Sequence, residues 1–105
     1  MTETDLKKEI DDICRQIIQK YQPHKIILFG SAAWGTFGTD SDLDFFIIKD
    51  DPRPGGERIH DVAGMFEHTV ATDVIVYTPA EVEQCIKWGD PFVKNVLSRG
   101  KIIYG

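Results

Sequence analysis

The sequence has 105 residues, of which 42% are hydrophobic and 28% charged, and a formal net charge of −5 at pH 7. This length suffices for one domain over residues 1–105, but not for a catalytic domain plus a separate substrate domain. No apolar run approaches the roughly 18 residues of a membrane span and no secretory signal is visible, so we expect a soluble cytoplasmic protein. Because no cluster of Lys and Arg offsets the negative charge, we expect no general nucleic-acid binding.

The first half of the chain predicts two helices and two strands. Apolar residues from Leu6 to Tyr21 recur at intervals of three and four, which predicts a helix with one buried face that ends before Pro23. Residues 25–30 (KIILFG) and 42–49 (DLDFFIIK) each predict a short buried strand. After a loop rich in proline and glycine, helical spacing predicts a second helix with the apolar residues Ile59, Val62, Ala63 and Phe66.

The second half predicts a strand, two helices and an edge strand. Residues 72–78 (TDVIVYT) predict the third strand, and Thr78 with Glu81 has capping-box spacing with a proline between them, which starts a helix. Asp90-Pro91 starts the last helix in the same way, before a short strand over residues 101–105. The side chains that we expect this last helix to bury are Phe92, Val93, Val96 and Leu97.

Three aspartates are expected at one edge of the sheet. Asp42 and Asp44 point to the same face of their strand, roughly 7 Å apart, and two such carboxylates are stabilised most simply by a shared divalent cation. Asp73 starts the third strand, and the long helical connection between the second and third strands requires a parallel pair. Parallel strands begin at the same edge, so the three carboxylates are expected to meet there.

The first strand should end at this same edge, because its short connection to the second favours an antiparallel pair. Gly30 lets the backbone approach a ligand closely, and a short helix starting at Ser31 would offer free N–H groups to phosphate oxygens. The predicted order is therefore α-β-α-β-α-β-α-α-β, a small mixed sheet packed with helices in the α/β (α+β) class. A phosphate cradle facing carboxylates is what two-metal nucleotidyl transfer requires.

These residues resemble the minimal nucleotidyltransferase domain of the DNA polymerase beta superfamily, which is marked by Gly-Ser, ten residues and Asp-x-Asp. Here Gly30-Ser31 precedes residues 32–41, and Asp42-Leu43-Asp44 follows. The resemblance implies the nucleotidyltransferase fold over nearly the whole chain and two Mg²⁺ ions, with Mn²⁺ as an alternative. It implies nucleotide contacts at Gly30, Ser31, Gly35 and Ser41, and catalytic, metal-binding carboxylates at Asp42, Asp44 and Asp73.

The resulting hypothesis is a Mg²⁺-dependent enzyme that transfers a nucleoside monophosphate, with AMP from ATP preferred, to a hydroxyl of a protein or small molecule. Small members of the family are often antitoxins that adenylylate an all-helical HEPN ribonuclease toxin, so the resemblance implies such a partner. The lack of a second domain in the sequence favours a protein acceptor. Homo-oligomerisation is left open.

A second hypothesis is a non-catalytic module that binds a nucleotide or masks a partner protein. Many family members have arginines in the glycine-serine loop where this chain has Ala32 and Trp34, so either the affinity for triphosphate is weaker or a cation such as Lys25 or Arg53 takes their place. Trp34 could stack on a base or dock against the core. The three acids oppose this second hypothesis, because a binding surface has no need of mutually repelling carboxylates.

Overall fold

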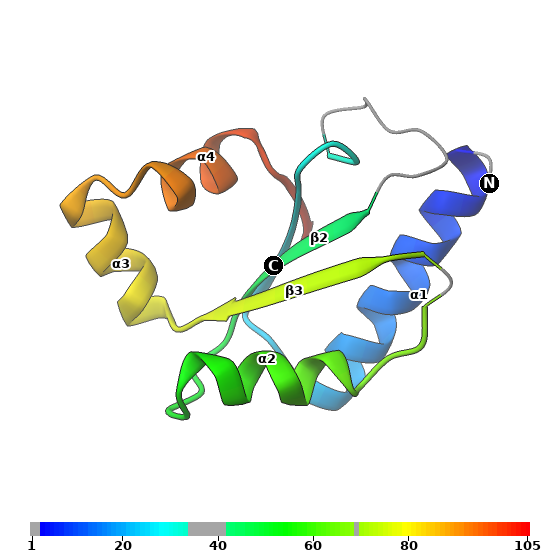
Figure 1. Ribbon diagram of the computed structural model, residues 1–105, viewed down its shortest axis with the longest axis horizontal. Helices are drawn as coiled ribbons and strands as arrows, with labels where there is room; N and C mark the ends of the chain where they lie inside the picture. The colour runs from blue at the N-terminus through cyan, green and yellow to red at the C-terminus, as the bar shows by residue number, and fades with distance from the viewer. Residues whose placement is uncertain (1–2, 34–41, 69) are drawn as a thin grey trace.

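Four strands form one mixed sheet in the order β3-β2-β1-β4. The computed structural model describes residues 3–33, 42–68 and 70–105 (Figure 1). Along the chain the elements are α1 (Glu3–Tyr21), β1 (Lys25–Phe29), β2 (Leu43–Ile48), α2 (Gly55–Ala63), β3 (Thr72–Tyr77), α3 (Pro79–Trp88), α4 (Pro91–Arg99) and β4 (Lys101–Tyr104).

The pairing of the strands follows from the lengths of their connections. β1 and β2 are antiparallel, whereas β2 and β3, which are joined through α2, are parallel. β4 pairs antiparallel with the other side of β1 and is an edge strand. The predicted directions, the mixed sheet and the edge position of the last strand are all confirmed.

Helices cover both faces of the sheet, with α1 and α2 on one face and α3 and α4 on the other (Figure 1). Alternate residues of each strand supply the two cores, as the two-residue period of a strand requires. In β2, Phe45 packs in the core under α1 while Phe46 packs in the core under α3 and α4. Both rings are fully buried, so β2 lies at the centre of the molecule.

Side chains at the helix starts fix where α3 and α4 begin. The Thr78 side chain accepts a hydrogen bond from the backbone N–H of Glu81, whose carboxylate accepts from the N–H of Thr78, so the predicted capping box is confirmed. Asp90 accepts from the N–H of Val93 at the start of α4. These caps satisfy N–H groups that lack partners within the helix.

Two expectations of burial were wrong. Phe92 and Leu97 of α4 are 41% and 38% exposed, while Val93 and Val96 are buried as predicted. The reason is that α4 is a short helix on the surface, which turns only a narrow stripe toward the sheet. Phe66 is buried but lies beyond the end of α2, because the chain leaves the helix at Gly64.

The start of the glycine-serine loop is a turn. The N–H of Ala33 donates to the carbonyl of Gly30 at 3.1 Å. The rest of the short helix predicted from Ser31 lies outside the described residues. Within the described part of the chain, no helix is long and apolar enough to cross a membrane.

Candidate active site at the edge of the sheet

Three residues form a row across the sheet at the edge where β2 and β3 begin and β1 ends. Phe29 of β1 is the register partner of Asp44 in β2, and Asp44 is the register partner of Asp73 in β3. Register partners in neighbouring strands point to the same face. The two carboxylates therefore belong to the face that α3 and α4 cover farther along the strands.

Gly30 lies directly against Asp44. Its φ is +79°, a conformation that side chains disfavour, and a Cβ built on it would lie 2.5 Å from Oδ2 of Asp44. Glycine is thus favoured here for the turn, and a larger residue would also have to displace the Asp44 carboxylate. Ser31 follows immediately in the turn, so the end of β1 and the carboxylate of β2 are next to each other.

Electrostatics set Asp44 apart from the other acids. Burial raises the pKa of Asp44 above its usual range, and the neighbouring carboxylates of Asp73 and Asp42 raise it further. Both neighbours are exposed, whereas Asp44 is half-buried. A partly buried carboxylate repelled by two others is stabilised by a cation.

The donor chemistry at this edge fits a divalent metal ion. Carboxylate oxygens are the ligands that Mg²⁺ prefers, and Asp44 and Asp73 sit side by side in the register. Among the residues that the structure describes, however, no group of three or more His, Cys, Asp or Glu side chains is arranged to hold a metal ion. The assignment of Asp42, Asp44 and Asp73 as joint ligands stays a prediction.

Some residues predicted for the site cannot be placed beside it. Gly35, Ser41 and Trp34 lie outside the described residues. Lys25 pairs in register with Ile48, at the opposite end of β2 from Asp44. Arg53 also follows that far end, where it binds Asp51 and Asp61, so within this chain the idea that either cation replaces the missing arginines was wrong.

Sequence reasoning missed an aromatic cluster beside the row. The Phe92 ring packs edge-on against Phe29 with centroids 5.6 Å apart, and Phe46 contacts both Phe92 and Tyr77. The cluster gives the carboxylates an apolar border on their own sheet face. The sequence signal was Phe92, a large apolar residue at the start of the last helix, together with the aromatic residues of the three strands.

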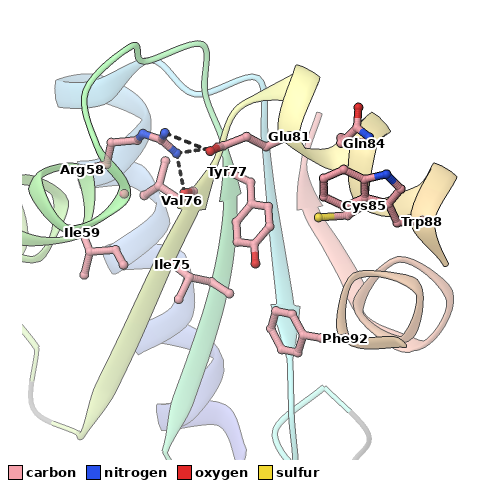
Figure 2. Close-up of a pocket in the computed structure, with 11 residues that line it drawn as sticks. Arg58, Ile59, Ile75, Val76, Tyr77, Glu81, Gln84, Cys85, Trp88 and Phe92 are labelled. Carbon is pink, nitrogen blue, oxygen red and sulfur yellow. Dashed lines mark hydrogen bonds and ion pairs between the residues drawn. The ribbon is translucent and has the colours of Figure 1, made fainter. Parts of the chain in front are cut away.

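A groove of about 650 Å³ adjoins this cluster along the outer side of β3. Ile75 and Tyr77 of β3 and Phe92 line it, together with residues of α2 and α3 (Figure 2). The charged residues that line it are Arg58 and Glu81, which bind each other at 2.7 Å. The groove is therefore largely apolar, and Ile75 of its lining lies two residues after Asp73 on β3.

The class of protein follows from comparisons of the fold and the sequence with known proteins. The structure is similar to the crystal structure of a putative nucleotidyltransferase from Sulfolobus solfataricus, with a TM-score of 0.62 over 97% of this chain and 87% of that chain, at 15% identity. The model of the family described as "Polymerase beta, Nucleotidyltransferase" matches residues 8–105. The chain belongs to this polymerase beta nucleotidyltransferase family, as the sequence motif predicted.

A similar curated protein comes from Methanocaldococcus jannaschii. It carries the name putative protein adenylyltransferase and is 29% identical to this chain over 102 residues. The match covers 93% of this chain and 97% of the relative, so the two proteins correspond over nearly their whole lengths.

Proposed function

We propose that this chain is a Mg²⁺-dependent nucleotidyltransferase that transfers AMP from ATP to a hydroxyl group of a protein. The observation that carries the proposal is the packing of Gly30 against Asp44, which is itself the register partner of Asp73. A backbone turn that can approach phosphates thus borders two carboxylates that can hold cations. The name of the M. jannaschii relative supports a protein as the acceptor.

Each residue of the proposed site has a distinct task. Gly30 and Ser31 bind the β- and γ-phosphates, with Gly35 and Ser41 as further nucleotide contacts. Asp42, Asp44 and Asp73 would hold two Mg²⁺ ions, or Mn²⁺, which supply positive charge to the phosphates and lower the pKa of the attacking hydroxyl. Asp73, on the strand farthest from Gly30, faces the acceptor.

The reaction exchanges one phosphorus–oxygen bond for another. The acceptor oxygen attacks the α-phosphorus and forms a bond to it, while the bond between the α-phosphorus and the bridging oxygen breaks. Pyrophosphate leaves with that electron pair, and solvent takes the hydroxyl proton. The products are an AMP ester of the acceptor and pyrophosphate.

The partner that we propose is a HEPN-type ribonuclease, which the chain would inhibit as an antitoxin. The test incubates the chain, Mg²⁺ and a HEPN protein encoded next to it with ATP labelled at either the α- or the γ-phosphate. We expect label on the partner from the α position only. Omission of Mg²⁺ or the substitution Asp44→Asn should abolish it.

The matched control is Asp50→Asn, an exposed acid beyond the far end of β2. It should transfer AMP like wild type. Asp44→Asn should fold at least as stably as wild type, because it removes a carboxylate that two others repel. Transfer from the γ position would instead make the chain a kinase, and tight binding without any label would favour the alternative of a non-catalytic module that masks its partner.

A further inference from the structure

We propose that the groove along the outer side of β3 binds an extended, basic segment of the acceptor protein and delivers its hydroxyl to Asp73. This inference rests on the proposed function, and it adds where the acceptor docks and what its sequence must look like. The groove lies between α2 and α3 (Figure 2). It lies beyond the row of carboxylates and shares β3 with it.

The geometry of displacement puts the acceptor on the β3 side. Attacking and leaving oxygens lie on opposite sides of the phosphorus. With the pyrophosphate at Gly30-Ser31, at the end of β1, and the α-phosphate over Asp44 on the central strand β2, the attacking hydroxyl comes from the side of β3. Since neighbouring strands lie about 4.8 Å apart, Asp73 is the residue of the row nearest to it.

The walls of the groove are exposed apolar side chains of the kind that protein partners bind. Trp88, at the end of α3, is 77% exposed, and Phe92 and Ile59 are 41% and 36% exposed. Tryptophan is enriched among the residues that dominate binding energy at protein interfaces. β3 is also an edge strand, but Arg58 donates to the carbonyl of Val76 at 3.0 Å and covers the strand backbone there. We therefore expect the segment to bind through the exposed side chains of the groove.

The strand itself sets the spacing within the acceptor segment. Ile75 and Tyr77 lie two and four residues after Asp73 on the same face of β3, roughly 7 and 13 Å along the strand. An extended segment that runs alongside has the same rise per residue. Its apolar anchor should therefore stand two to four residues from the hydroxyl that receives AMP.

The charges near the groove determine which net charge the acceptor segment should carry. Arg58 is buried and donates to both carboxylate oxygens of Glu81, so the charged lining of the groove is internally neutralised. Asp73 stands on β3 two residues before Ile75 of the groove lining, and Asp44 beside it is repelled by both Asp73 and Asp42. The carboxylates of Asp42, Asp44 and Asp73 and a bound triphosphate together carry more negative charge than two divalent cations neutralise. Lysine or arginine near the acceptor hydroxyl is therefore favoured, and acidic residues are disfavoured.

The experiment selects peptides from a phage-displayed library of random sequences, about a dozen residues long, on the immobilised wild-type chain. Enriched peptides are synthesised, and their affinity is measured for wild type, for Trp88→Ala and for Ile102→Ala. Both substituted side chains are exposed, so neither variant should unfold. Ile102 is 56% exposed on β4, the opposite edge of the sheet, and serves as the matched control.

We expect basic peptides with an apolar residue two to four positions from Ser, Thr or Tyr. Trp88→Ala should weaken their binding at least about tenfold, while Ile102→Ala should change it less than about twofold. Failure to enrich any peptide, enrichment of acidic peptides, or equal affinity of Trp88→Ala and wild type would overturn the proposal.

Labelled ATP then separates the inference from the proposed function. Peptides that need Trp88 and acquire AMP in the presence of Mg²⁺ support both. Peptides that need Trp88 but acquire no AMP support the groove as a docking surface and contradict the transferase. AMP transfer to peptides whose binding ignores Trp88 supports the transferase and overturns the groove.

Discussion

Gly30→Ala is the substitution through which the structure of the candidate site can be tested most directly. The glycine has φ +79°, and the new Cβ would lie 2.5 Å from Oδ2 and 3.4 Å from Cγ of Asp44. The left-handed conformation costs a residue with a side chain about 1–2 kcal/mol. Turning the Asp44 side chain out of the way adds about 0.5–1.5 kcal/mol.

The expected destabilisation is the sum of these terms, about 1.5–3.5 kcal/mol with a midpoint of about 2.5 kcal/mol. For a domain of this size it corresponds to a fall in Tm of roughly 10–20 °C. The assay is urea and thermal unfolding followed by circular dichroism. Gly56→Ala is the matched control, because nothing lies within 4 Å of a Cβ there and alanine in helix α2 should stabilise by about 0.5–1 kcal/mol.

A double-mutant cycle separates the contact from the backbone strain. In an Asp44→Ala background the close contact with Oδ2 is gone, and the nearest remaining atom of that side chain, Cβ, is 3.7 Å away. Gly30→Ala should then cost about 1 kcal/mol less than in wild type. An equal cost in both backgrounds, or no cost at all in wild type, would refute the proposed contact between the β1 turn and Asp44.

Three further predictions concern the far side of the sheet and the helix starts. The Arg53 guanidinium holds the pKa of Asp51 well below its usual range, so the wild-type protein should lose stability as the pH falls below about 4. The substitution Asp51→Asn should lower Tm at pH 7 and make Tm depend less on pH in the acid range. A Tm–pH curve identical to that of wild type would contradict this role of Asp51. Thr78→Ala removes the cap of α3 and should cost about 1 kcal/mol in urea unfolding, with Ser at the same position as the control that restores it. Arg58→Met removes a buried donor to the Glu81 carboxylate and to the Arg53 carbonyl, so we expect the free energy of unfolding to fall by about 2–3 kcal/mol. An unchanged free energy of unfolding would show that these hydrogen bonds add no net stability.

The acid-sensitive network illustrates a feature that sequence patterns do not reveal. Asp51 is 5% exposed and accepts hydrogen bonds from the Tyr21 hydroxyl at 2.6 Å and from the Arg53 side chain. In the sequence these residues belong to a helix and to a loop rich in proline. Their convergence depends on where the end of α1 meets the chain after β2, which no local pattern encodes.

The sequence alone determined the elements and the family. Apolar periodicity, prolines and capping residues are local signals, so α1, the three main strands and the start of α3 were predicted within a few residues. The spacing of Gly30-Ser31 and Asp42-x-Asp44 identified the family because it is a property of the chain itself. The long connection through α2 even predicted that Asp73 begins a parallel neighbour of β2.

Only the tertiary structure decided what surrounds the carboxylates. The exact register that makes Phe29, Asp44 and Asp73 one row depends on how the strands pair across the sheet. The same pairing places the Asp44 carboxylate so close to Gly30 that a Cβ added there would lie 2.5 Å from Oδ2. The exposure of Phe92 and the groove that it helps to line depend on how α3 and α4 settle on that sheet. These features arise from packing between segments that are distant in the sequence, so they cannot be predicted from a residue's neighbours along the chain.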